Sequence, residues 1–364
     1  MWFGIGGIVG WPFASALVIP FVGEEILMMV MTNELEAFHR LLDGTVRSLL
    51  VLALQFAIDV FFYKKIACVP WNIVQYNIFS GSAKGPALYG TEPWHYYAMN
   101  LFINFNIWFV LALATLPLVA MQHFGNRQAV SRLSFFRTLV FVVPFYMWIG
   151  IFTLQPHKEE RFMYPAYPAL ALNAAISAHI LLTWIGSKAP RSLMSRIPGP
   201  IKFYVLTLIT ILAIEAGILR SASLATGYTA PLSVYSPLRE PGVARPGDNV
   251  CLGKEWYRFP SSYHLGNGTR AKFVKSEFSG LLPGEFREAS TGFGLYPGAW
   301  LVPPGMNDEN KEDMGKYTDI AQCHFLVDSQ FSSNPPTKVE PDYISDTEHW
   351  EALKCKPFLD TAST

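Results

Sequence analysis

The sequence predicts an α-helical multi-pass membrane protein with about six transmembrane helices, followed by a mixed α/β domain in water. Two observations carry this prediction. The 364 residues are 51% hydrophobic and 15% charged, with 27 Phe, 16 Tyr and 10 Trp, which exceeds the apolar and aromatic content of an ordinary soluble protein. Six apolar stretches also approach the roughly 20 residues that a helix needs to cross the hydrocarbon core. They are residues 3–23, 48–63, 98–121, 135–154, 164–186 and 201–222.

The composition changes sharply after the last apolar stretch. From residue 224 onward the chain is rich in Pro, Gly and charged residues and has no further run long enough to span a membrane. The predicted division is a transmembrane region at 1–223, with water-facing loops at 68–97 and 155–163, and a separate C-terminal domain at 224–364.

Basic residues in the loops predict the orientation, because cytosolic loops carry an excess of Lys and Arg. The basic residues between the third and fourth stretches and between the fifth and sixth are Arg127, Arg132, Lys188, Arg191, Arg196 and Lys202. Those loops are therefore expected in the cytosol. Loops 68–97 and 155–163 and the C-terminal domain are then lumenal.

Two other features agree with a lumenal C-terminal domain. The sequon Asn267-Gly268-Thr269 lies in that domain, as a glycan acceptor would. The four cysteines fall on the same predicted side, where disulfides persist. They are Cys68, Cys251, Cys323 and Cys355. Four cysteines allow three pairings, which stay open here together with free buried thiols.

The densest polar cluster beside a predicted span is Gln155–Phe162, which contains five consecutive charged or titratable residues. Lys158 and Arg161 are candidate ligands for an anionic phosphate. His157, Glu159 and Glu160 are candidates for proton transfer or for holding sugar hydroxyls. The alternative is a solvated turn whose charges pair with one another.

A second cluster lies in the 68–97 loop, where residues 70–77 and 90–97 together contain Trp, Tyr, Asn and Gln. Aromatic faces cover the apolar side of a sugar while amides bond its hydroxyls. Trp94 and Tyr96 are candidate sugar ligands, and Glu92 is a candidate catalytic carboxylate. Amphipathic aromatics also gather at membrane interfaces without any ligand, and this alternative is equally supported.

Asp59 lies inside the second apolar stretch. An intramembrane carboxylate is costly and is therefore a functional candidate. Pairing with Lys64, itself a candidate phosphate or sugar ligand, is the alternative. Asn104 and Asn106 are expected to hydrogen-bond between helices.

The remaining patterns limit the chemistry. Lys plus Arg and Asp plus Glu both number 28, so no basic excess indicates nucleic-acid binding. The sequence contains no nucleotide-phosphate loop and no metal-ligand motif. No metal site is predicted, and a requirement for a divalent metal stays open.

Several motifs resemble one family. Gly90–Trp94 followed by Asn104–Asn106, and Gln155–Phe162, are similar to signatures of the glycosyltransferase family 22 mannosyltransferases, membrane enzymes of the GT-C type. The segments at 253–262, 306–308 and 323–328 carry the resemblance into the C-terminal domain.

The resemblance implies an enzyme of the endoplasmic reticulum membrane. It would transfer mannose in α-1,2 linkage from dolichyl-phosphate mannose to the dolichyl-linked oligosaccharide that becomes the N-glycan. By resemblance, Lys158 and Arg161 hold the lipid phosphate, and His157 and Glu159 shape the site. The family's catalytic acidic residue is expected in a loop ahead of Met1, so the chain is expected to be N-terminally truncated. The alternatives are an inactive fragment that binds glycolipid or a partner, and a sister α-1,6 or GPI-anchor mannosyltransferase.

Overall fold

The structure is a computed structural model that describes residues 1–32, 35–80, 84–125, 132–186, 193–286, 300–333 and 335–360. The chain divides into two compact units. The first is Met1–Gly217 with Glu288–Leu301, and the second is Ile218–Arg287 with Val302–Thr364. The predicted basic residues Arg127, Lys188 and Arg191 lie outside the described residues.

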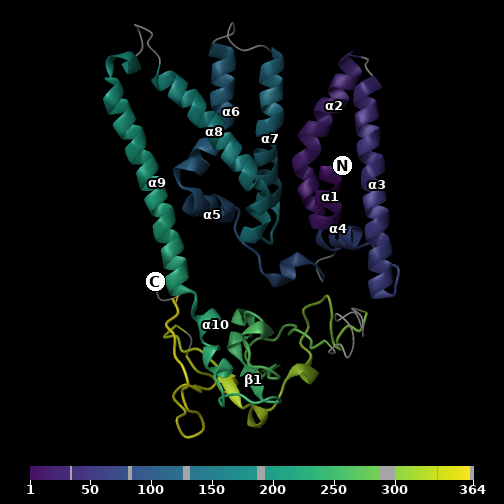
Figure 1. Cartoon of the computed structure of the whole chain (residues 1–364), viewed down its shortest axis with the longest axis vertical. Helices are drawn as coiled ribbons and strands as arrows, with labels where there is room; N and C mark the ends of the chain where they lie inside the picture. Colours follow the sequence, from purple (N-terminus) through teal and green to yellow (C-terminus); the bar gives the residue numbers. More distant parts are fainter. Residues whose placement is uncertain are drawn as a thin grey trace. The chain divides into compact units, whose positions relative to one another are not determined.

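Six helical segments in the described residues are long and apolar enough to cross a membrane, which confirms a multi-pass membrane protein. The helices that carry them are labelled in Figure 1. The segments are Pro12–Thr32, Leu35–Tyr63, Ile107–Gly125, Leu133–Leu154, Glu160–Ile185 and Gly199–Gly227.

The first span differs from the prediction, because the expected helix at 3–23 is interrupted. The chain forms a short helix α1 (Trp2–Ile5) and a π-helical turn, and then becomes extended at Trp11, with φ −127° and ψ 117°. Pro12 explains the break, since proline disfavours helical geometry in the residue before it and lacks an amide hydrogen. After a 3₁₀ turn the chain continues as α2 (Ile19–Thr32).

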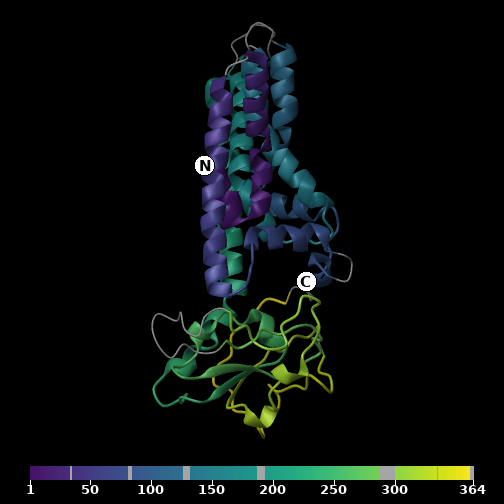
Figure 2. The ribbon, with the colours of Figure 1, turned by 90° about the vertical axis from the view of Figure 1, so that its right-hand side faces the viewer.

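The second span is longer than the apolar stretch at 48–63. Helix α3 runs Leu35–Tyr63, and Figure 2 shows it as one uninterrupted helix. The first turns of α3 contain charged residues, and these form ion pairs. Arg40 binds Glu25 of α2 at 2.8 Å, and Arg47 binds Asp43 one turn earlier at 2.8 Å. Such pairs suit an exposed helix surface, so the helix begins well before its apolar part.

The third predicted stretch, 98–121, is two helices. Helix α5 (Tyr96–Phe105) ends at Asn106, whose φ is 44°, and α6 (Ile107–Gly125) begins directly after it. Asparagine tolerates positive φ better than most residues. Its Oδ1 accepts a hydrogen bond from the amide of Ile107 at 2.7 Å, and its Nδ2 donates to the carbonyl of Ala213 in α9 (Gly199–Gly227) at 3.3 Å.

Helices α6, α7 (Arg132–Leu154) and α8 (Tyr167–Ile185) enclose the core of the first unit. The buried side chains include Leu101, Phe109, Phe145, Trp148, Met163 and Leu170. Thr115 of α6 and Ser177 of α8 share a buried hydrogen bond of 2.8 Å. Buried hydroxyl pairs of this kind fix how two apolar helices pack. Helix α4 (Val69–Phe79) precedes the first of two loops described below.

Helix α9 (Gly199–Gly227) leads into the second unit, and the boundary predicted at residue 223 lies on this helix. The second unit contains the short helix α10 (Ala230–Ser233) and a three-stranded parallel sheet. Its strands are β1 (Asn249–Leu252), β2 (Arg270–Phe273) and β3 (Phe325–Val327), in the order β2-β1-β3. Turns, 3₁₀ helices and extended segments make up most of its other described residues.

A disulfide between Cys251 and Cys323 joins β1 to the residue that leads into β3. The structure thus combines the two alternatives that the sequence left open, with one disulfide and two free thiols, Cys68 and Cys355.

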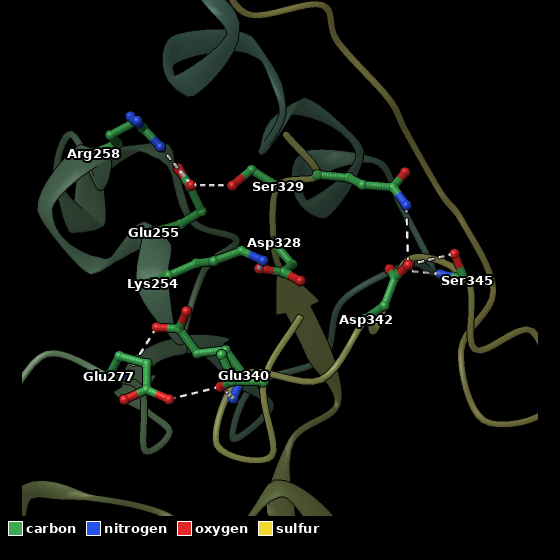
Figure 3. A network of polar contacts seen from close by, with 11 residues as sticks. Lys254, Glu255, Arg258, Glu277, Asp328, Ser329, Glu340, Asp342 and Ser345 are labelled. Carbon is green, nitrogen blue, oxygen red and sulfur yellow. Dashed lines mark hydrogen bonds and ion pairs between the residues drawn. The ribbon is translucent and has the colours of Figure 1, made fainter. Parts of the chain in front are cut away.

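The second unit also contains a polar network that joins two of the motif segments (Figure 3). Lys254 Nζ lies 3.3 Å from Asp328 Oδ1, and the Asp328 side chain is 8% exposed. Burial raises the pKa of Asp328, while the Lys254 charge lowers it. One turn on, Arg258 Nη1 donates to Glu255 Oε1 at 2.6 Å, and the Ser329 hydroxyl donates to the same oxygen. Segments 253–262 and 323–328 are therefore parts of one packed structure.

Candidate active site

Two loops of the first unit are fastened together by hydrogen bonds to backbone groups. The first loop is residues 84–95 and the second is residues 155–163. Lys158 is buried and donates from Nζ to the carbonyls of Glu92, at 2.8 Å, and Gln155, at 2.6 Å. The amide of Glu92 donates to the carbonyl of Pro156 at 3.0 Å. These contacts place Lys158 inside the loop pair, where its ammonium group binds backbone carbonyls and does not line the cavity described below.

The Tyr97 side chain, at the start of α5, hydrogen-bonds to the backbone of the second loop. Its side chain is fully buried, and its hydroxyl donates to the carbonyl of Glu159 and accepts from the Glu159 amide, both at 3.2 Å. Burial raises the pKa of Tyr97, so the phenol remains protonated and able to donate. The hydroxyl thereby fixes the backbone that carries Glu159.

Replacing Tyr97 with Phe is expected to lower the free energy of unfolding by about 1–3 kcal/mol, because two partly buried backbone groups of Glu159 lose their partner. Thermal unfolding in detergent measures the change. Tyr96→Phe is the matched control, since the Tyr96 hydroxyl makes no hydrogen bond among the described residues. Equal stability of the two variants would contradict the role given to Tyr97.

His157 links both loops and Glu159. Its Nδ1 lies 2.8 Å from the Gly90 carbonyl, which can only accept, so Nδ1 carries a proton. Its Nε2 lies 3.0 Å from Glu159 Oε1, and that contact also needs a proton. His157 therefore bridges the Gly90 carbonyl of the first loop and the Glu159 carboxylate of the second.

Arg161 completes this group. Its Nε lies 2.5 Å from Glu159 Oε2 and its Nη2 lies 2.9 Å from Oε1, which is the planar two-bond geometry that guanidinium forms with carboxylates. The Arg161 side chain is 68% exposed, whereas that of His157 is 12% exposed. Arg161 is thus the accessible cation of the second loop, and Glu159 holds it in place.

The three residues border a cavity of about 430 Å³, a volume that falls within the range of small-molecule sites. The lining residues are Trp11, Tyr76, Asn77, Pro86, Tyr89, His157, Glu159, Arg161 and Phe162. A lining that combines aromatic rings with a guanidinium suits a ligand that has both apolar and anionic parts.

One aromatic residue of the cavity, Trp11, lies at the helix break before Pro12. Trp11 stacks on Phe162 with ring centroids 5.5 Å apart, and Phe152 and Trp148 lie 5.5 Å and 5.7 Å from Trp11. Trp148 is buried and donates from Nε1 to the carbonyl of Phe162 at 2.9 Å. The buried Trp148 thus fixes the positions of Trp11 and Phe162, two aromatic residues that line the cavity.

Glu92 and Glu160 are carboxylates of the same loops and have no ion-pair partner among the described residues. Glu160 Oε1 accepts a hydrogen bond from Asn104 Nδ2 at 3.1 Å. Burial, and next the negative charges of Glu92 and Glu160, raise the pKa of Tyr96. Both carboxylates thus lie near the Tyr96 hydroxyl. The Asn104 bond joins α5 to the helical segment that begins at Glu160, as the sequence predicted for this side chain.

The other predicted residues lie elsewhere. Trp94 is 73% exposed and its ring contacts His95. Asp59 is buried, but its carboxylate accepts from Gln55 Nε2 at 2.8 Å and from the Val69 amide at 3.3 Å.

The carboxylate of Asp59 therefore caps α4 and is not paired with Lys64. Lys64 instead lies over the Phe61 ring, 4.5 Å from its centroid. Neither residue lines the cavity.

Sequence reasoning missed Trp11, Tyr97 and Phe162. The Trp-Pro pair inside an apolar stretch was the available signal for Trp11, since proline marks a helix break. In the described residues, no group of three or more His, Cys, Asp or Glu side chains is placed to hold a metal ion.

Comparisons with known proteins match this chain over nearly its whole length. The α-1,2-mannosyltransferase alg9 of Schizosaccharomyces pombe is 39% identical over 99% of this chain and 62% of the relative. The human α-1,2-mannosyltransferase ALG9 is 37% identical over 98% of this chain and 57% of the relative. The GPI mannosyltransferase 3 of Candida albicans is 31% identical over 33% of this chain. No solved structure matches.

The chain therefore spans roughly three fifths of the length of these α-1,2-mannosyltransferases. The sequence profile of the Alg9-like mannosyltransferase family matches residues 1–266. That range includes the six spans, both loops and every residue that lines the cavity. With the membrane helices, the paired loops and this match together, the chain belongs to the Alg9-like mannosyltransferase family.

Proposed function

We propose that the cavity receives dolichyl-phosphate mannose, and that the protein transfers the mannose in α-1,2 linkage to the dolichyl-linked oligosaccharide from which N-glycans are made. The observation that carries the proposal is Arg161, an exposed guanidinium at a cavity that aromatic side chains also line. The names of the matched relatives support the linkage.

The reaction is a single displacement at the anomeric carbon. The bond from that carbon to an acceptor oxygen forms while its bond to the phosphate oxygen breaks, and the β donor becomes an α product. The acceptor hydroxyl gives its proton to a base, and dolichyl phosphate leaves with the bonding electrons. Arg161 stabilises the charge that develops on the phosphate, and His157, which lines the same cavity, would orient the donor beside it.

Glu92 and Glu160 are this chain's candidates for orienting or deprotonating the acceptor hydroxyl, because neither is neutralised by a cation among the described residues. The rings of Trp11 and Phe162 would cover the apolar face of the sugar or the first isoprene unit. Both loops would face the lumen of the endoplasmic reticulum, an orientation supported by the loop charges and by the Cys251–Cys323 disulfide.

The test uses membranes from cells that lack their own α-1,2-mannosyltransferase and express this chain. We expect labelled mannose to pass from dolichyl-phosphate mannose to a mannose-deficient lipid-linked oligosaccharide, and an α-1,2-specific mannosidase to release it. A product resistant to that mannosidase would favour the sister α-1,6 activity. Binding of the glycolipid without transfer would favour the non-enzymatic alternative.

Glu159 is expected to compete with the donor phosphate for Arg161. Replacing Glu159 with Gln should lower the KM for dolichyl-phosphate mannose about 2- to 5-fold, because a partly exposed ion pair is worth up to about 1 kcal/mol. Steady-state rates at varied donor concentration measure it.

Asp43→Asn is the matched control, since it breaks the Asp43–Arg47 ion pair on α3, away from the cavity. An unchanged or raised KM in Glu159→Gln would contradict the competition.

A further inference from the structure

The sequon Asn267-Gly268-Thr269 lies at the corner of a tight turn that leads into β2. The amide of Thr269 donates to the carbonyl of Gly266 at 3.2 Å, which closes a four-residue turn with Asn267 and Gly268 at its centre. The φ of Gly268 is 77°, a value typical of glycine at the third position of a turn. Asn267 occupies the outer corner and is exposed.

The turn is held by contacts on its inner side. A side chain at position 268 would place its Cβ 3.1 Å from Pro246 Cα and 2.9 Å from Pro246 Cβ, so only glycine fits. The carbonyl of Gly268 accepts from the Gly247 amide at 2.9 Å, and the Thr269 hydroxyl donates to Gly266 at 2.7 Å. Within the described residues the Asn267 side chain makes no hydrogen bond or ion pair that would compete with its use as an acceptor.

The disulfide indicates the compartment independently of the sequon. In the sheet, Asn249 of β1 pairs with Arg270, the residue after the sequon, and Cys251 pairs with Lys272. The turn and the Cys251–Cys323 bond thus belong to one small sheet and lie on the same side of the membrane. Disulfides persist in oxidising compartments, which include the lumen where sequons are modified.

We propose that Asn267 carries an N-linked glycan. The glycan would extend from an exposed corner into water, so it displaces no packed side chain. Its presence does not depend on the transferase activity proposed above, because any lumenal sequon is an acceptor. It would place the whole second unit in the lumen.

The experiment expresses the full chain in cells that keep their own glycosylation pathway intact, so that loss of activity in the chain cannot remove the glycan. We expect peptide N-glycosidase to increase the gel mobility of the chain by one core glycan. Asn267→Gln and Thr269→Ala should both migrate like the digested protein, whereas Thr269→Ser, which keeps the hydroxyl, should still respond to the enzyme.

A second sequon tests the orientation. Gln128→Thr creates a sequon at Asn126, in the loop predicted to be cytosolic, and in an Asn267→Gln background we expect no glycan there. The proposal is overturned if the wild-type chain does not respond to the glycosidase while a secreted reporter in the same cells does. It is also overturned if Asn126 is modified and Asn267 is not.

Discussion

Replacing Arg161 with Lys is expected to lower the rate of mannosyl transfer by about 100-fold or more. Lysine keeps the positive charge but loses the planar fork that binds two oxygens at once. Losing one donor that stabilises developing charge typically costs about 100- to 1,000-fold in rate. The measurement is labelled mannose transferred per unit time at saturating donor, with expression matched by immunoblot.

Two controls test whether the lost rate comes from the Arg161 guanidinium itself or from a general effect on the folded protein. Arg47→Lys alters an arginine that is likewise paired with a carboxylate, on α3, and should leave transfer unchanged. Thermal unfolding of Arg161→Lys should match the wild type, because the side chain is largely exposed. Transfer within about 3-fold of wild type in Arg161→Lys would remove the guanidinium from the proposed mechanism.

Replacing Cys251 and Cys323 together with Ala is expected to cost about 4 kcal/mol of folding free energy in the second unit. The bond closes a separation of 72 residues, and the entropy of closing a loop of that size corresponds to roughly this value. Cys251 is also fully buried in the central strand of the sheet. Limited proteolysis followed by fragment mapping would show early cleavage between residues 218 and 360.

The free thiols supply the matched comparison. Replacing Cys68 and Cys355 together with Ala also removes two sulfurs but breaks no bond, so proteolysis should follow the wild-type pattern. If the two double variants were cleaved at the same rate, the disulfide would contribute little to the second unit.

The sequence was sufficient to predict a multi-pass membrane protein, because the hydropathy of a span is summed over about 20 residues and a few polar residues change it little. It was insufficient for helix bounds. Pro12 breaks one apolar stretch and Asn106 divides another, while α3 extends through charged residues that an apolar criterion rejects. Single residues with special backbone geometry decide such bounds.

The site was predicted in part. A dense run of charge marked His157 to Arg161, and three of these residues, His157, Glu159 and Arg161, line one cavity. Sequence could not separate Lys158 from Arg161, since burial and the carbonyls that bind Lys158 come from packing of two loops. Trp11 is over 140 residues from Phe162 along the chain, and only the fold brings their rings together. The pairing of Cys251 with Cys323 depends likewise on the register of the sheet.

The most direct test of the account asks where the lipid phosphate binds. A photoreactive analogue of dolichyl phosphate is cross-linked to the purified chain in detergent, and the labelled peptides are mapped. We predict labelling of peptides that contain Trp11 or residues 155–162, with competition by unlabelled dolichyl phosphate and strong loss in Arg161→Lys. Labelling confined to residues 218–360, or equal labelling of wild type and Arg161→Lys, would contradict a phosphate site at this cavity.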